Sequence, residues 1–130
     1  MAIDKNIKIL IVDDSKFMRS VLKDILENNG YLNIIETDNG EDAISSYDNE
    51  KPDVVFLDLI LPKIDGLQVL EDIIPKGAKV IVVSVIDLED IINETRAKGA
   101  HEYIVKASGA VEKPFSEENV LDAMEKVFGE

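Results

Sequence analysis

Apolar residues follow two patterns along the chain, short continuous runs and stretches with a helical period. The runs are rich in Ile and Val and do not alternate with polar residues, which is typical of strands covered on both faces of a parallel sheet. We expect strands at residues 7–12, 32–37, 54–57, 80–83 and 103–105. The stretches between them predict helices around residues 17–26, 41–47, 67–74, 88–95 and 120–128.

The elements therefore read as β-α repeated five times. This repetition predicts an α/β fold with right-handed crossovers and helices on both faces of a parallel sheet. We expect the doubly wound, flavodoxin-like strand order 2-1-3-4-5, in a single domain that covers residues 1–130. A sheet of this kind carries its site beyond the carboxyl ends of the strands.

Composition excludes several kinds of chemistry. The 130 residues contain no Cys and one His, His101, so thiolate zinc sites, cysteine nucleophiles and histidine-rich metal sites are disfavoured. Asp and Glu number 27 against 14 Lys and Arg, and the net charge of −13 repels nucleic acids and anionic membranes. No apolar run is long enough to span a bilayer and no signal peptide is visible, so we expect a cytoplasmic protein.

Polar residues follow four of the predicted strands. Asp13 and Asp14 follow the first strand, Asp58 the third, Ser84 the fourth and Lys106 the fifth. In the expected order the first and third strands are neighbours, so the three carboxylates converge. Two carboxylates about 4 Å apart repel by roughly 4 kcal/mol at an effective dielectric constant of about 20, so the group calls for a cation.

Carboxylates without His or Cys favour magnesium, and magnesium suits phosphoryl transfer. Asp58 could then attack phosphorus, while Ser84 and a lysine bind the phosphoryl oxygens. Each residue also has an ordinary interpretation: Asp13 and Asp14 as helix caps, Asp58 as a turn residue. The functional interpretation depends on their coincidence at one edge of the sheet.

Nearly the whole chain resembles the receiver domain of two-component response regulators. The residues that carry the resemblance are segments 9–15, 52–58, 61–66, 82–84, 99–104 and 113–115. The pattern at 13–19, Asp-Asp-Ser-Lys-Phe-Met-Arg, is most similar to chemotaxis regulators of the CheY type.

The resemblance implies a role for each matching residue. Asp58 accepts phosphate from a histidine kinase, and Ser84 and Tyr103 are the switch residues. The implied Mg²⁺ ligands are Asp14, Asp58 and the backbone carbonyl of Ile60, with Asp13 acting through a water. The implied output surface is formed by the fourth helix, the fifth strand and the fifth helix.

The chain departs from the family pattern after the fifth strand. The family joins its lysine directly to Pro-Phe, whereas seven residues, 107–113, separate Lys106 from Pro114 here. The site lysine is therefore Lys106 or Lys113, and we favour Lys106 because the strand fixes its reach. We expect the insertion to form a loop beside the site and the last helix to begin near Ser116.

Two further departures concern phosphate turnover. Val85 is bulky where the family has a small residue, and Ile60 cannot orient a water. We expect both to slow turnover.

We expect a monomeric, single-domain response regulator of a chemotaxis system, with only slow self-catalysed phosphorylation and dephosphorylation and no enzyme activity of its own. Its expected partners are a CheA-like histidine kinase and a downstream motor, adaptor or phosphatase protein. Alternatives are a phosphorelay intermediate, an unphosphorylated scaffold and an aspartate-nucleophile phosphatase of the haloacid-dehalogenase type. The last needs a second acid where this chain has Ile60.

Overall fold

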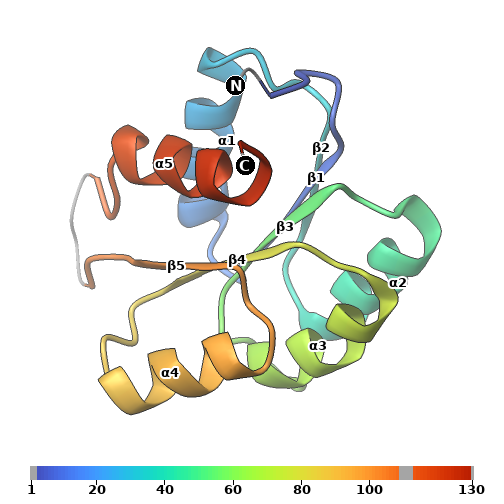
Figure 1. The fold of residues 1–130 in the computed structure, drawn as a ribbon, viewed down its shortest axis with the longest axis vertical. Coiled ribbons are helices and arrows are strands. Elements are labelled where there is room, and N and C mark those ends of the chain that lie inside the picture. The colour runs from blue at the N-terminus through green and yellow to red at the C-terminus, as the bar shows by residue number, and fades with distance from the viewer. Residues whose placement is uncertain (1–2, 109–112, 130) are drawn as a thin grey trace.

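Strands and helices alternate along the chain in the computed structural model, which describes residues 3–108 and 113–129 (Figure 1). The strands are β1 (Ile9–Val12), β2 (Ile34–Thr37), β3 (Val54–Leu57), β4 (Val80–Ser84) and β5 (Glu102–Val105). The helices are α1 (Lys16–Asn28), α2 (Gly40–Glu50), α3 (Gly66–Ile73), α4 (Glu89–Ala97) and α5 (Glu117–Phe128), with a 3-10 helix, η1 (Ile74–Lys76), after α3.

The strands form one parallel sheet in the order β2-β1-β3-β4-β5, which confirms the predicted fold class. Val12, the last residue of β1, pairs with Leu57, the last residue of β3. Beyond this pair the Asp58 amide donates to the Val12 carbonyl at 3.0 Å. The chains that leave β1 and β3 therefore emerge side by side at the carboxyl edge of the sheet.

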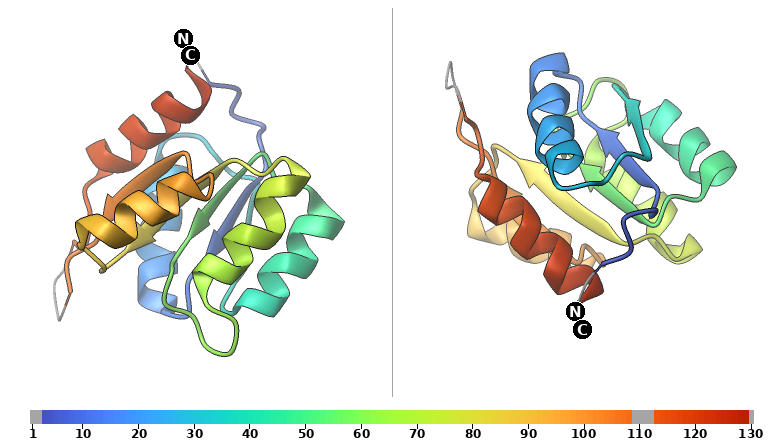
Figure 2. Two further views of the ribbon diagram at one scale, coloured as in Figure 1. Left: turned by 60° about the horizontal axis from the view of Figure 1, so that its bottom comes forward. Right: turned by 90° about the horizontal axis from the view of Figure 1, so that it is seen from above.

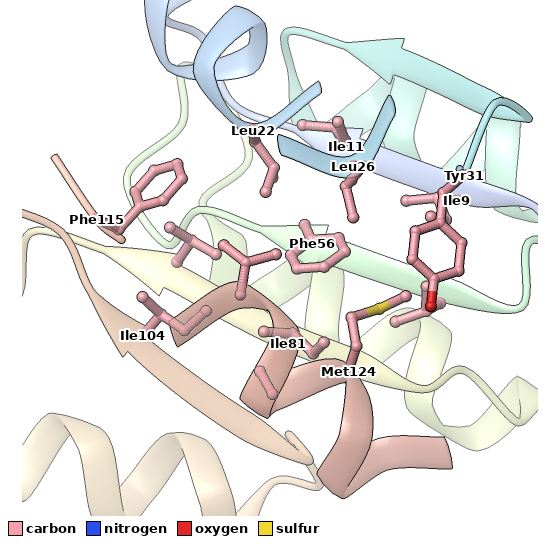
Figure 3. Packing of buried hydrophobic residues seen from close by; sticks show 14 residues of the cluster. Ile9, Ile11, Leu22, Leu26, Tyr31, Phe56, Ile81, Ile104, Phe115 and Met124 are labelled. Atoms are coloured by element: carbon pink, nitrogen blue, oxygen red, sulfur yellow. The ribbon is translucent and has the colours of Figure 1, made fainter. Parts of the chain in front are cut away.

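Helices cover both faces of the sheet, with α1 and α5 on one face and α2, α3 and α4 on the other (Figure 2). Each face has its own apolar core, and Phe56 of β3 lies at the centre of the core beneath α1 and α5, close to Leu26, Ile81 and Met124 (Figure 3). Burial on both faces explains why the strands lack an alternating pattern. No helix within residues 3–108 and 113–129 is long and apolar enough to cross a membrane.

Two strands begin later than the sequence predicts. Ile7 lies in a turn, where its amide donates to the Asp4 carbonyl, and β1 begins at Ile9. Leu32 is 72% exposed, and β2 begins at Ile34. An apolar run marks a buried strand but also includes apolar residues of the preceding loop.

Two residues that the helical period assigns to apolar stripes are exposed in the structure. Phe17, in the first turn of α1, is 51% exposed, and Leu88, just before α4, is 63% exposed. Both lie past the carboxyl edge of the sheet, where no strand covers them. The apolar stripe of each of these helices therefore begins with a residue that lies outside the core.

Four of the five helices begin with a capping side chain near this same edge. The residues whose side chains accept an amide hydrogen bond from the first turn are Ser15, Asn39, Asp65 and Ser116. Ser116 is the predicted cap of α5, and the prediction is confirmed. The N-cap of α4, Leu88, has no such hydrogen bond, so the start of α4 lacks this local support.

Candidate functional site

Three carboxylates meet at the carboxyl edge of the sheet, as the sequence predicts. Asp13 and Asp14 follow β1 and Asp58 follows β3, and one carboxylate oxygen of each lies within 4.8 Å of those of the others. Asp13 and Asp58 are buried, whereas Asp14 is exposed. The cluster therefore opens to solvent on the side of Asp14.

A buried ammonium group joins two of these carboxylates. Lys106 Nζ lies 2.6 Å from Asp13 Oδ2 and 3.2 Å from Asp58 Oδ2, and the lysine side chain is 5% exposed. Its backbone amide donates to the Ser84 carbonyl at 2.8 Å, which extends the β4–β5 ladder by one residue. The strand therefore places the Lys106 side chain in the site.

The other candidate lysine lies elsewhere. Lys113 is exposed and lines a groove with Val21 and Ile25 of α1. The structure thus brings Lys106, and not Lys113, to the Asp58 carboxylate. Most of the predicted loop, residues 109–112, lies outside the described residues. At its base the Ala107 amide donates to the Pro114 carbonyl at 2.7 Å, so the two ends of the insertion are adjacent.

Burial raises the pKa of the Asp58 carboxyl, and the nearby Asp13 carboxylate adds to this effect. The Lys106 ammonium and the Ile60 amide, which donates to Asp58 Oδ1 at 3.1 Å, act in the opposite direction. Burial is the largest of these causes. The ionised form of Asp58 is therefore costly in this structure, although two donors face it.

The charges of the cluster do not balance. Three carboxylates face one ammonium group within the described residues, and the Asp14 carboxylate makes no hydrogen bond or ion pair there. A donor set made only of oxygens with an excess negative charge fits a hard divalent cation such as Mg²⁺. Asp13, Asp14 and Asp58 could hold such an ion.

Ser84 and Tyr103 contact the same residue of the loop between β4 and α4. Ser84 is fully buried, and its Oγ accepts a hydrogen bond from the Ile86 amide at 3.3 Å. The Tyr103 hydroxyl donates to the Ile86 carbonyl at 2.7 Å, and burial raises the pKa of that hydroxyl. A shift of either side chain therefore acts on this loop.

The two residues expected to slow phosphate turnover both lie at this edge. The Ile60 side chain is 51% exposed, and Val85 is half-buried. No polar side chain stands at the position of Ile60, two residues past Asp58.

Sequence reasoning missed two residues that hold the backbone of the site. Arg19 of α1 donates to the carbonyl of Asp13, and an ideal Cβ on Gly66 would overlap the Asp58 carbonyl oxygen. The available signal for Arg19 was its place at the end of the pattern 13–19, which carries the resemblance. Gly66 ends the segment 61–66 that carries the resemblance, but the constraint on it depends on how α3 packs on β3.

Comparison with known proteins identifies similar chains. The family described as response regulator receiver domain matches residues 9–125. The chemotaxis protein CheY of Listeria monocytogenes is 39% identical over 92% of this chain and 97% of its own, and that of Thermotoga maritima is 37% identical over 92% and 96%. In the CheX–CheY–BeF₃–Mg²⁺ complex from Borrelia burgdorferi, a chain with 34% identity superposes with a TM-score of 0.84 over 94% of this chain and 89% of that one.

Proposed function

Because this chain belongs to the family of response regulator receiver domains, we propose that it is a signalling protein controlled by phosphorylation of Asp58. The observation that carries the proposal is the position of the Asp58 carboxylate, buried at the end of β3 between two further aspartates and the Lys106 ammonium. Receiver domains are typically phosphoacceptor modules and not enzymes.

The proposed step transfers a phosphoryl group from a phosphohistidine. An oxygen of the ionised Asp58 carboxylate attacks phosphorus, a P–O bond forms and the P–N bond breaks. The imidazole nitrogen takes the electron pair, and an acyl phosphate remains on Asp58. The Lys106 ammonium, already in contact with Asp58, pairs with an oxygen of the phosphoryl group.

Asp14, Asp58 and the backbone carbonyl of Ile60 are the groups that we propose to hold Mg²⁺, with Asp13 acting through a water. When bound, the ion neutralises charge on the transferring phosphoryl group. The unbalanced charge of the carboxylates and the lack of a partner for Asp14 among the described residues support this assignment.

Ser84 and Tyr103 are the proposed switch. Phosphorylation adds up to about two negative charges beside the Ser84 hydroxyl. If Ser84 turns to donate to the phosphoryl group, its contact with the Ile86 amide is lost, and Tyr103 is bound to the same residue. The change then reaches the surface formed by α4, β5 and α5, where we place the output contact.

The relatives support a proposal for the biological role. Several similar chains are chemotaxis proteins, and one is bound to CheX in its structure. We propose that this protein acts in the cytoplasm as a monomeric, single-domain chemotaxis regulator. A CheA-like histidine kinase supplies its phosphate, and it docks on a motor, adaptor or phosphatase protein. Neither a nucleic acid nor a membrane is a proposed partner, in keeping with the net charge of −13.

Mass spectrometry after incubation with acetyl phosphate and Mg²⁺ tests the proposal. We expect one acid-labile phosphoryl adduct on the wild type, with release of acetate, and none on Asp58→Ala. Asp24→Ala, which removes an exposed carboxylate of α1, is the matched control and should be modified like the wild type. An adduct that persists on Asp58→Ala would refute the assignment.

A further inference from the structure

Arg19 makes a hydrogen bond to the main chain of the acidic cluster. Its Nη1 donates to the main-chain carbonyl of Asp13 at 2.6 Å, and its side chain is 15% exposed. A charged donor on a carbonyl at this distance makes a strong hydrogen bond. Arg19 lies in α1, so the contact joins this helix to the end of β1.

That carbonyl belongs to the peptide group between Asp13 and Asp14. The Asp13 side chain has its own contacts, since Oδ1 accepts from the Ser15 amide at 2.9 Å and Oδ2 from Lys106 at 2.6 Å. The Asp14 carboxylate has no hydrogen bond or ion pair within the described part of the chain. The direction of Asp14 therefore depends on its backbone, and Arg19 fixes the peptide plane that precedes it.

The Arg19 guanidinium group also forms an ion pair with a residue of β2. Arg19 Nε donates to Glu36 Oε1 of β2 at 3.1 Å, and Glu36 Oε2 accepts from Lys23 Nζ at 3.3 Å. Exposed ion pairs of this kind add little stability. They can still fix the direction of the guanidinium group, whose planar donors then point at two acceptors.

We propose that Arg19 is a positioning residue for the metal site, which it serves by orienting the Asp13–Asp14 peptide. The proposal rests on the Mg²⁺ site of the proposed function. Loss of a group that orients a metal ligand typically weakens metal affinity by about 10- to 100-fold. We expect Arg19→Met, which keeps an unbranched apolar stem, to weaken Mg²⁺ binding about tenfold.

Electrostatics alone predicts the opposite result. Arg19→Met removes a positive charge near an acidic cluster, and this change by itself strengthens the attraction for a divalent cation. Lys23→Ala is the matched control, because it also removes a positive charge that pairs with Glu36 but has no contact with Asp13. A lysine at position 19 keeps a charged donor, so Arg19→Lys should recover most of the lost affinity.

Isothermal titration calorimetry with MgCl₂ alone, at fixed ionic strength, measures the affinity of each variant. Acetyl phosphate labelling provides a second readout: Arg19→Met should react slowly at limiting Mg²⁺ and approach the wild-type rate at saturating Mg²⁺. A merely structural defect would not be relieved by added metal in this way. Arg19→Gln, whose side chain ends two bonds short of the Arg Nη atoms, serves as a second neutral variant if Arg19→Met does not fold.

The outcomes separate this inference from the proposed function. Weaker binding in Arg19→Met, recovery in Arg19→Lys and an affinity within twofold of wild type in Lys23→Ala support it. Unchanged or tighter binding in the neutral variant at position 19, or an equal loss in Lys23→Ala, overturns it. If the wild type itself does not bind Mg²⁺, the metal site of the proposed function fails, and the inference fails with it.

Discussion

Burial raises the pKa of the Asp58 carboxyl above its ordinary value of 3.8, and Lys106 only partly offsets this effect. An acid whose pKa is higher in the folded state stabilises that state most below its unfolded pKa. This contribution is lost as the pH rises through the folded pKa. Near neutral pH, the ionised carboxylate therefore opposes folding relative to a neutral group of the same shape.

We accordingly expect Asp58→Asn to melt a few degrees higher than the wild type at pH 7. The difference should shrink as the pH falls through the raised pKa of Asp58, because the wild-type carboxyl is then protonated in the folded state. Thermal unfolding followed by circular dichroism at pH 7 and across an acidic pH series measures this effect. A lower melting temperature for Asp58→Asn at pH 7 would show that the contact with Lys106 outweighs the burial cost.

Gly66 lies against the backbone of Asp58. Its amide donates to the Leu59 carbonyl at 2.8 Å, and an ideal Cβ there would overlap the Asp58 carbonyl oxygen and the Leu59 Cα. Both obstacles are backbone atoms, which cannot rotate away. A side chain at this position must push α3 away from the end of β3, and with it the Asp58 main chain.

We expect Gly66→Ala to cost about 1–3 kcal/mol of stability and to slow labelling by acetyl phosphate. Gly77→Ala is the control, because Gly77 has a φ of 97° but nothing within 4 Å of an added Cβ. That change should cost about 1–2 kcal/mol of backbone strain and leave the labelling rate unchanged. Urea unfolding and labelling kinetics measure the two effects, and equal labelling rates for the two variants would contradict the prediction.

At the scale of elements, the connection between β5 and α5 carries the main departure from the family pattern. β5 ends at Val105, and a hydrogen bond from the Ala107 amide to the Pro114 carbonyl closes the base of the insertion. Lys106 precedes this base and is held by the sheet and by two carboxylates. The chemistry proposed for Lys106 therefore does not require the residues beyond it.

We expect a variant in which residues 108–113 are replaced by Gly-Gly to fold and to be labelled by acetyl phosphate like the wild type. Two glycines suit a tight turn between two paired residues, and shortening a loop changes its closure entropy little. The variant also lacks Lys113. Lys106→Ala, compared under the same conditions, should be labelled much more slowly, whereas loss of labelling in the shortened variant would assign the chemistry to the insertion.

For the whole molecule, the acidic cluster links metal binding to stability. A ligand that binds only the folded state stabilises it by about 2.7 kcal/mol at a hundred times its dissociation constant. Here the ion would also relieve repulsion between Asp13, Asp14 and Asp58, since one carboxylate oxygen of each lies within 4.8 Å of those of the others.

We therefore expect the melting temperature of the wild type to rise steadily across a millimolar MgCl₂ titration. Asp14→Ala keeps the buried pair of Asp13 and Lys106 but removes the exposed carboxylate, so its response should be much smaller. An NaCl titration at matched ionic strength controls for screening of the net charge. An equal response to both salts would argue against a specific site.

The sequence alone determined the repeating α/β pattern and the place of Asp13, Asp14 and Asp58 at the ends of the first and third strands. Parallel strands that end at one edge of a sheet bring the residues after them together, so the meeting of the three carboxylates needed, in addition, only the flavodoxin-like strand order that we assumed for this repeat. These inferences could not show which lysine stands beside Asp58. That depends on the register of β5 against β4, which extends the ladder to Lys106 and leaves Lys113 at a groove beside α1.

The exposure of Phe17 and Leu88, the contact of Arg19 with the Asp13 carbonyl and the close packing of Gly66 on Asp58 were likewise decided by the tertiary structure. Hydrophobic periodicity records which side of a helix is apolar, but not whether a strand reaches far enough to cover its first turn. Contacts to a backbone carbonyl leave no mark in the identity of the residue contacted. Such contacts exist only once β1, β3 and the helices that follow them have been packed together.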